Sequence, residues 1–258
     1  MSIPKVIHYF WFGNGQLSDI NVKCINSWRK YCPDYEIKLW NEDNFDIHSN
    51  SFMEAAYNQK KWALITDYAR FYILYKYGGI YIETDSEILR PLEDSFLKHK
   101  AFFARAGEDF TLSILGMEAG HPVGKYMCDY YDTHNFIKDG IVITVNTILT
   151  NTLRDNYDLP APSKDIEVLK DDIAIYPPKY FYTDWEKGRL NDKNSYIFHY
   201  GEATWTGEEY KTRQRINNKC VSIFGKKLGW QIGRVVFSLS YYGFFETIRR
   251  RMRHLKNK

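Results

Sequence analysis

An apolar run of helix length, residues 62–77, is the feature that most constrains how this chain can fold. Apolar and aromatic residues occupy nearly every position of the run, and a helix that is apolar almost all round is usually buried. Gly78 and Gly79 end it, as glycine commonly does at a helix C-terminus. A short apolar strand, residues 80–82, follows at once. We therefore expect a buried helix and a buried strand at the centre of the fold.

The first forty residues predict a strand, a helix and a second strand. Residues 5–12 are apolar, aromatic and β-branched, and residues 35–40 alternate like a strand. Between them, residues 18–28 hold a Ser-Asp pair that can cap a helix and apolar residues at helical spacing. This order is typical of a βαβ unit with a parallel sheet, so the expected fold class is α/β. Further strands are expected at 101–104, 111–115 and 196–200, and further helices at 123–134 and 144–154.

Basic residues gather at the C-terminus. The chain has 258 residues and a net charge of +3, but residues 226–258 hold nine Lys or Arg and a single acid, which leaves residues 1–225 net acidic. Aromatic and aliphatic residues precede these cations, a pattern that suits an interfacial helix on an anionic membrane. The alternatives are a helix packed on the body of the protein and a nucleic-acid tail, which nothing in the body supports. We expect one domain at 1–225 and a basic amphipathic helical tail at 226–258.

The cysteines and the N-terminus indicate a cellular compartment. The four cysteines are scattered and form no Cys-x-x-Cys pair, so neither a disulfide framework nor a zinc site is signalled. The first residues lack a signal-peptide pattern, and no uncharged apolar run is long enough to span a bilayer. We expect a cytoplasmic protein that lies peripherally on the inner face of the cell membrane.

Charged groups interrupt the apolar helix and follow the strand after it. Asp67 and Arg70 stand three apart on one helix face, as either a closed ion pair or a polar pair directed into a cleft. Glu83 and Asp85 follow the strand, at the edge where open α/β sheets bind ligands. Residues two apart in an extended segment share a face, so both carboxylates are expected to converge, unless this is an ordinary acidic loop. Such oxygens suit Mg²⁺ or Mn²⁺, with a diphosphate supplying further ligands.

Several segments together resemble glycosyltransferase family 32, the capsular polysaccharide group with an Asp-x-Asp motif. The opening Ile-Pro-Lys-Val-Ile-His-Tyr-Phe-Trp-Phe-Gly of residues 3–13 resembles the first strand of that family. The Thr-Asp-Tyr-Ala-Arg of 66–70 and the block 74–85, which ends in Glu-Thr-Asp, resemble its central signature. The resemblance is close over 3–92, patchy to about 182, and local again near 199–205, where it includes Trp205.

The resemblance implies a GT-A type fold, in which a Rossmann-like sheet flanked by helices binds a nucleotide sugar. It also implies a catalytic role for Asp67, Arg70 and Asp85, with the base of the donor stacked on Trp11. The residues expected to contact the nucleotide sugar are Phe10, Trp11, Asp67, Arg70, Glu83, Thr84 and Asp85. The residues expected to bind the metal are Asp85, Glu83 and His199.

One residue departs from the family pattern, which usually has Asp where this chain has Glu83. The extra methylene moves the carboxylate outward, so a weak or silent enzyme is an alternative. Each candidate also has a structural alternative: Trp11 can belong to the core, and His199 can be a hydrogen-bonded strand residue. His8 is expected to be structural.

The function expected from the residues and the resemblance is a metal-dependent, retaining hexosyl transfer. The donor is a nucleotide-diphosphate sugar, with uridine preferred by analogy and guanosine left open, and the cofactor is Mn²⁺ or Mg²⁺. The acceptor is a glycan, lipid-linked or free, in capsule, exopolysaccharide or lipopolysaccharide assembly, and nucleic acid is not an expected partner. The alternatives are a toxin- or effector-like protein glycosyltransferase and a catalytically silent nucleotide-sugar-binding protein.

Overall fold

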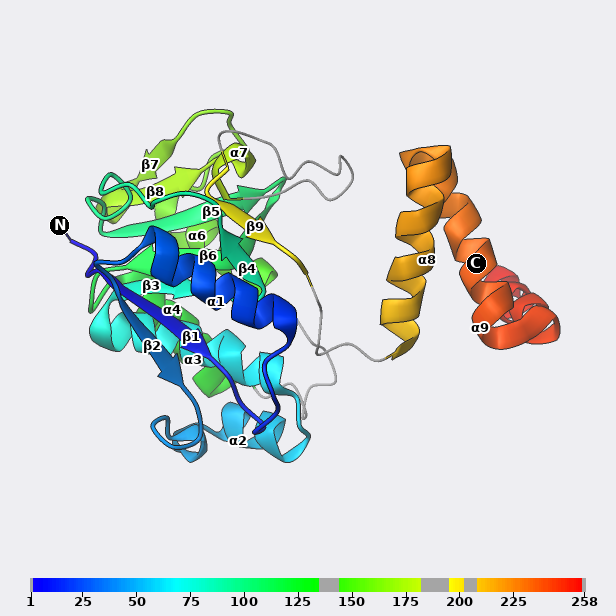
Figure 1. Cartoon of the computed structure of the whole chain (residues 1–258), viewed down its shortest axis with the longest axis horizontal. Helices are drawn as coiled ribbons and strands as arrows, with labels where there is room; N and C mark the ends of the chain where they lie inside the picture. Colours follow the sequence, from blue (N-terminus) through cyan, green and yellow to red (C-terminus); the bar gives the residue numbers. More distant parts are fainter. Residues whose placement is uncertain (1, 135–143, 182–194, 202–207, 257–258) are drawn as a thin grey trace. The chain divides into compact units, whose positions relative to one another are not determined.

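A seven-stranded mixed sheet forms the centre of the chain up to residue 201 (Figure 1). Its strand order is β2-β1-β3-β6-β5-β8-β7, and a separate two-stranded sheet pairs β4 with β9. β1 runs parallel to β2 and β3, and β5 runs parallel to β8, whereas β6 is antiparallel to both of its neighbours and β7 is antiparallel to β8. The expected α/β fold class is confirmed, with a parallel β1–β2–β3 portion and antiparallel pairs beyond it.

The structure is a computed structural model that describes residues 2–134, 144–181, 195–201 and 208–256. The strands are β1 (Val6–Phe10), β2 (Glu36–Trp40), β3 (Gly79–Ile82), β4 (Ser86–Ile88), β5 (Ala101–Ala106), β6 (Asp109–Met117), β7 (Glu167–Leu169), β8 (Ile173–Tyr176) and β9 (Ile197–His199). The helices are α1 (Asp19–Tyr31), α2 (Ser51–Asn58), α3 (Trp62–Tyr77), α4 (Pro122–Thr133), α6 (Val145–Tyr157), α7 (Pro178–Phe181), α8 (Glu208–Phe224) and α9 (Lys226–Lys256). Short 3₁₀ turns lie at Ile47–Ser49 and Lys170–Asp172.

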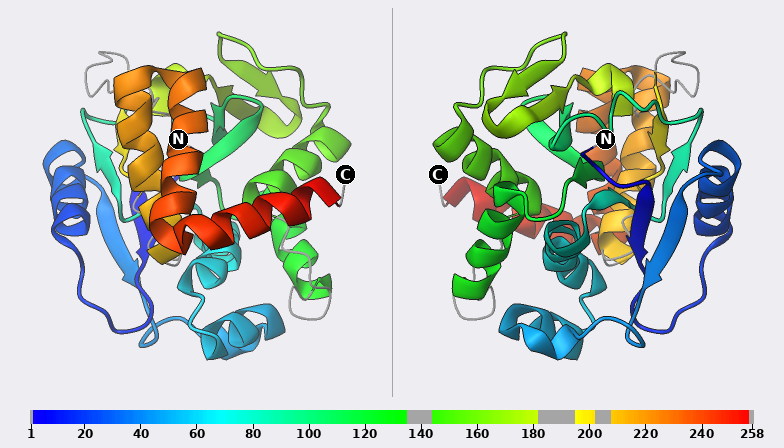
Figure 2. Two further views of the ribbon diagram at one scale, coloured as in Figure 1. Left: turned by 90° about the vertical axis from the view of Figure 1, so that its right-hand side faces the viewer. Right: turned by 90° about the vertical axis from the view of Figure 1, so that its left-hand side faces the viewer.

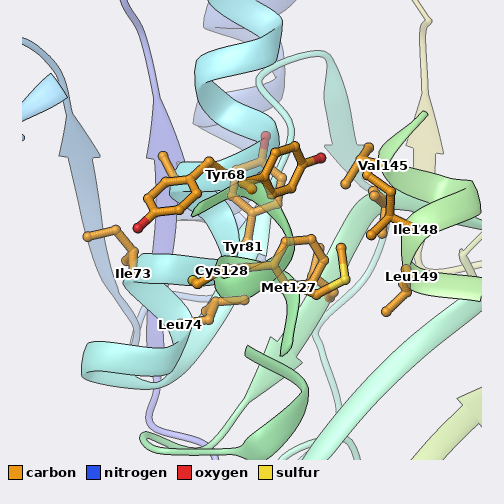
Figure 3. Close-up of a cluster of buried hydrophobic side chains, with 14 of the residues drawn as sticks. Tyr68, Ile73, Leu74, Tyr81, Met127, Cys128, Val145, Ile148 and Leu149 are labelled. Atoms are coloured by element: carbon orange, nitrogen blue, oxygen red, sulfur yellow. The ribbon is translucent and has the colours of Figure 1, made fainter. Parts of the chain in front are cut away.

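Hydrophobic clusters cover both faces of the large sheet. One cluster joins the sheet to α2, α3, α4 and α6, and the other joins it to α1, α7 and the β4–β9 pair. Figure 2 shows α1 in dark blue and α4 and α6 in green on opposite sides of the strands. β3 contributes to both clusters by alternation, with Tyr81 in the first and Ile80 and Ile82 in the second. Figure 3 shows Tyr68 and Tyr81 within the first cluster, near Met127.

The sequence signals for α1 and α3 are confirmed by their ends. Ser18 caps α1 by accepting a hydrogen bond from the Asn21 amide at 3.2 Å, and the Asn21 side chain accepts one from the Ser18 amide at 3.0 Å. α3 ends at Gly78, whose amide bonds to Leu74 O at 2.8 Å. Gly79 has a φ of +107°, and a Cβ there would approach His8 Nε2 within 2.8 Å, so the close contact between β3 and β1 requires glycine.

His8 ties the end of α3 to the β1–β2 pair. Its Nε2 lies 2.9 Å from Gly78 O, and Trp40 Nε1 donates to its Nδ1 at 3.1 Å. The ring therefore carries its proton on Nε2, and it is buried. Burial lowers the pKa of His8 to about 4, so the ring is neutral near pH 7.

Contacts group α8 and α9 into a second unit, separate from the described residues up to Gly201. Gly229 and Gly233 lie where an added Cβ would come within 2.4 Å of α8, so the two helices pack closely. The charge pattern predicts a boundary after residue 225. Contacts instead group α8 with α9, so the unit defined by packing begins before the basic residues do. Gly243 has non-helical angles and bends α9. No described helix combines the length and the apolarity that crossing a bilayer requires.

Candidate functional site

Two carboxylates and an imidazole form a cluster just beyond β3. Glu83, Asp85 and His199 each offer an atom, and these atoms lie within 4.8 Å of one another. His199 Nε2 is 3.1 Å from Glu83 Oε2 and 3.2 Å from Asp85 Oδ1. The structure thus brings together the three residues that were expected to bind a metal. We call them the carboxylate–histidine cluster.

A turn, rather than an extended segment, makes the two carboxylates converge. The Glu83 amide bonds to Ser113 O on β6 at 3.0 Å, which prolongs the β3–β6 pairing by one residue. The chain then turns, and the Ser86 amide bonds back to Glu83 O at 2.9 Å. The expected convergence is found, but its expected cause is wrong, because Thr84 and Asp85 occupy a turn and do not continue the alternation of the strand.

The β4–β9 pair delivers the histidine to the two acids. These strands are antiparallel, with Ser86 opposite His199 in the register. The Tyr200 amide also bonds to Asp85 O at 2.8 Å. Residues more than 110 positions apart in the chain therefore meet because the turn that follows β3 leads directly into β4.

Arg70 lies inside α3 and uses all five of its N–H donors. Nε bonds to Thr66 O at 2.9 Å, and Nη2 bonds to Asp67 Oδ1 at 2.9 Å and to Thr66 Oγ1 at 3.4 Å. Nη1 bonds to Glu83 Oε1 at 3.2 Å and to Leu112 O at 3.3 Å. The guanidinium also lies 4.7 Å from the Tyr81 ring centroid.

The Arg70 side chain is only 4% exposed, so this network is buried. Both readings of the Asp67–Arg70 pair apply in part, since the pair closes on itself and also extends to Glu83. One oxygen of Glu83 contacts Arg70 and the other contacts His199. This arrangement allows Arg70 to orient the carboxylates of Asp67 and Glu83.

The electrostatics of the cluster set the charge of its members. Burial alone would lower the pKa of His199, but hydrogen bonds to Asp85 and Glu83 raise it to about 10. Burial acts against ionisation of Glu83 too, yet His199 and Arg70 lower its pKa to about 2. Burial raises the pKa of Asp67 to about 7 despite Arg70. Without a bound cation, His199 is therefore an imidazolium between two carboxylates.

The donor set fits a divalent cation. Carboxylate oxygens suit Mg²⁺ and Mn²⁺, and an imidazole nitrogen is a common ligand of divalent transition metals. The three side chains are partly exposed, which leaves room for oxygens of another ligand.

The other residues expected to contact the nucleotide sugar differ in how far they are exposed. Phe10 packs in the core against Phe12, Phe45 and Tyr81 and is 4% exposed, so its ring offers almost no surface to a ligand. Trp11 directly follows β1 and is partly exposed, with its indole donating to Gly15 O at 2.6 Å. The remaining donor-side residue, Thr84, is partly exposed in the turn, and Trp205 lies outside the described residues.

Three residues next to the cluster escaped sequence reasoning. Lys23, Glu87 and Tyr200 bond to one another beside Asp85 and His199. The sequence offers two hints: Glu87 lies two residues after Asp85, and Tyr200 falls in the late segment that resembles the family. That these two residues meet Lys23 could not be inferred, because the contact depends on the packing of α1 against β4.

Comparison with known proteins matches the part of the chain that holds the acids of this site and Arg70. Residues 18–103 match the family described as "Glycosyltransferase sugar-binding region containing DXD motif". Inositol phosphoceramide mannosyltransferase 3 of Schizosaccharomyces pombe is 31% identical over an alignment of 134 residues, and the match covers 47% of this chain and 35% of that protein. The chain thus spans about a third of the yeast relative.

Two further likenesses extend over more of the chain. An uncharacterized glycosyltransferase of Acanthamoeba polyphaga mimivirus is 25% identical over an alignment of 229 residues, and the match covers 79% of this chain and 84% of that protein. The solved structure of PaToxG glycosyltransferase aligns with 59% of this chain and 68% of its own, with 17% identity and a TM-score of 0.48. Residues 18–103 are therefore similar to the glycosyltransferases whose sugar-binding region contains a DXD motif, in keeping with the resemblance to glycosyltransferase family 32.

Proposed function

We propose that this chain is a metal-dependent retaining hexosyltransferase. It takes a sugar from a nucleotide-diphosphate donor, with uridine preferred by analogy, and adds it to a glycan in capsule, exopolysaccharide or lipopolysaccharide assembly. The observation that carries the proposal is the carboxylate–histidine cluster, in which His199 joins two acids of the matched sugar-binding region, Glu83 and Asp85. Glu83, Asp85 and His199 would hold Mn²⁺ or Mg²⁺, which when bound neutralises negative charge on the departing diphosphate.

The chain's own residues would position the donor around that charge. Asp85 and His199 lie 3.2 Å apart where β4 begins opposite β9, so a cation held there would fix the place of the diphosphate relative to the sheet. Asp67 is partly exposed and can accept hydrogen bonds from sugar hydroxyls. Trp11, next to β1, offers a partly exposed indole on which a base can stack. Arg70 holds Asp67 and Glu83 in the orientation that these contacts need.

Within the described part of the site no side chain is assigned as a covalent nucleophile, so the proposed transfer is direct. The acceptor hydroxyl attacks the anomeric carbon on the face from which the diphosphate leaves, so the configuration is retained. The bond between that carbon and the phosphate oxygen breaks, and the leaving phosphate takes the proton of the hydroxyl. The transition state has oxocarbenium character, as at other glycosidic centres.

A panel of nucleotide sugars tests the proposal. Purified protein is incubated with uridine and guanosine diphosphate sugars, with Mn²⁺ or with EDTA, and release of the nucleoside diphosphate is measured. We expect slow hydrolysis of one donor with Mn²⁺ and none with EDTA. A protein that binds a donor but never releases its diphosphate, even with candidate glycan acceptors present, would be a silent binding protein instead.

The second unit supports a proposed place of action at an anionic membrane surface, with a lipid-linked acceptor. Leu228, Val235, Val236 and Leu239 are exposed and lie on one face of α9. Buried Gly229, Gly233 and Phe237 lie on another face of the same helix. The sequence then continues into the basic residues of 249–258. Apolar side chains beside a cationic segment are typical of helices that lie in a membrane interface.

Vesicle binding tests this location with the full chain. A Leu228→Asp/Leu239→Asp variant should lose binding to vesicles that contain phosphatidylglycerol. Val168→Asp is the matched control, because Val168 is an exposed apolar residue of β7 in the first unit. If wild-type protein and the variant sediment equally with anionic vesicles, this location is wrong, although the proposed transfer reaction is unaffected.

A further inference from the structure

We propose that Lys23, Glu87 and Tyr200 form a clamp that positions the carboxylate–histidine cluster for its cation while none of the three serves as a ligand. The inference rests on the proposed metal dependence. It concerns residues that lie outside the expected metal set, and its basis is the way in which α1 holds β4 and β9.

Helix α1 already holds the backbone of β4 on the buried side. Trp28 Nε1 donates to Ser86 O at 2.7 Å, and the Ile88 amide donates to Ser27 Oγ at 2.9 Å. All four of these residues are buried. One face of α1 therefore fixes the strand that begins one residue after Asp85.

The clamp completes this attachment on the solvent side. Lys23 lies one turn before Ser27 on α1, and its Nζ is 2.9 Å from Glu87 Oε2 and 2.7 Å from the Tyr200 hydroxyl. The Tyr200 hydroxyl donates to the same Glu87 oxygen at 2.6 Å. The three groups thus close a triangle that joins α1, β4 and the residue after β9.

Tyr200 transmits the clamp to the cluster. Its hydroxyl is fixed by Lys23 and Glu87, while its amide donates to Asp85 O at 2.8 Å. His199 is its neighbour in the chain. A tyrosine held at both ends therefore restrains the backbone of Asp85 and the position of His199 together.

Exposure argues for a positioning role rather than a role in global stability. The Lys23 side chain is 56% exposed, and exposed ion pairs contribute little to folding. Glu87 is 16% exposed, so its carboxylate is the better ordered partner. Residues that orient metal ligands lower metal affinity by about tenfold or more when they are replaced. Loss of the clamp should therefore loosen the cluster without unfolding the protein.

Mn²⁺ affinity of full-length protein, measured from the electron paramagnetic resonance signal of free Mn²⁺, tests the clamp. We expect Lys23→Met and Tyr200→Phe each to weaken binding by about tenfold with an unchanged thermal midpoint. Lys23→Arg keeps the charge and should recover most of the affinity. Lys30→Met and Tyr126→Phe are matched controls, since both residues are exposed and lie outside the cluster.

Each outcome decides between the clamp and the proposed function. If wild-type protein binds Mn²⁺, Asp85→Ala does not, and both clamp variants bind like wild type, the clamp is wrong and the metal site stands. If the clamp variants lose affinity only together with thermal stability, their role is structural and the clamp is also wrong. If wild-type protein takes up no Mn²⁺, the proposed metal dependence fails and the clamp fails with it.

Discussion

Two cations of the first unit, Arg70 and His199, contact the two oxygens of one carboxylate. Arg70 Nη1 lies 3.2 Å from Glu83 Oε1, and His199 Nε2 lies 3.1 Å from Glu83 Oε2. The Arg70 side chain is 4% exposed and all of its donors are used, whereas the His199 side chain is 28% exposed. The contact with Arg70 therefore belongs to a closed buried network. The contact with His199 is partly exposed, so a ligand could reach it.

Arg70 and His199 both carry positive charge, so charge does not distinguish their surroundings. The two residues differ in exposure and in how many of their hydrogen-bond donors are already used. A buried guanidinium with five acceptors cannot exchange a partner without leaving a charge unpaired. A partly exposed imidazole between two carboxylates can give up its place to a cation and gain a new partner. The predictions below test whether the two sides of Glu83 differ in this way.

Replacing Arg70 should have the largest effect, and the effect should be on stability. Arg70→Met removes the buried cation that partners the partly exposed Asp67 and Glu83 and leaves Glu83 with His199 alone, which we expect to cost about 3 kcal/mol in urea unfolding. The loss should shrink from pH 8 to pH 5, because the carboxylates can then bind protons in the folded state. Arg29→Met, at an exposed position of α1, is the control. A stable Arg70→Met protein would show that the network is not structural.

Replacing Asp85 should instead affect turnover. Asp85→Ala removes one carboxylate of the cluster, and we expect Mn²⁺-dependent donor hydrolysis to fall about a hundredfold or more. The thermal midpoint should change little, since Asp85 lies in a partly exposed turn. Asp129→Ala, in the exposed Lys125–Asp129 pair of α4, is the matched control. Donor turnover at the wild-type rate, with or without EDTA, would exclude the proposed cluster as the catalytic centre.

His8 offers a buried histidine without a carboxylate, and its pKa moves in the opposite direction to that of His199. Because burial lowers the pKa of His8 to about 4, the unfolded chain binds this proton more readily than the folded one. Stability from this residue is complete above pH 6.5 and falls as the pH drops toward 4. We expect wild-type protein to lose about 2 kcal/mol between pH 7 and pH 5 that His8→Gln does not lose. Equal pH dependence of the two proteins in urea unfolding would contradict this.

Shortening Glu83 should have the smallest effect. Glu83→Asp introduces the residue that is usual at this position in the family that the chain resembles. The shorter side chain cannot keep contacts with both Arg70 and His199. We expect a slightly lower thermal midpoint and a change in turnover below about tenfold, or about 1.4 kcal/mol. A loss as large as that of Asp85→Ala would mean that Glu83 binds the cation in a geometry that aspartate cannot reproduce.

Much of the fold could be read from local patterns. The apolar run of 62–77 is α3 with the same limits, and the strand that follows it is β3. The signals for α1, β1 and β2 are also reproduced within about three residues. These elements were readable because periodicity, capping residues and glycine act within a few positions of the chain. The antiparallel pairs of β6 were not readable, because strand partners depend on contacts distant in the sequence.

The sequence indicated which residues form the cluster but not how they are arranged. The acidic pair and His199 were named from the sequence and the family resemblance, and they meet in space. The turn at Thr84 and Asp85 was missed, because an acidic tripeptide after a strand fits an extended segment as well as a turn. The burial of Phe10 could not be inferred either, since neighbouring Phe10 and Trp11 look equally suited to a base until β1 assigns one to the core.

The sequence by itself determined the chemical types at the site and the elements that carry them, since both follow from residue identity and short-range pattern. Only the tertiary structure decided that Arg70 is saturated, that Glu83 divides its oxygens between two cations, and that Lys23 and Tyr200 reach Glu87. The physical reason is that hydrogen-bond saturation and exposure are properties of a packed neighbourhood. That neighbourhood is assembled from segments that lie far apart along the chain.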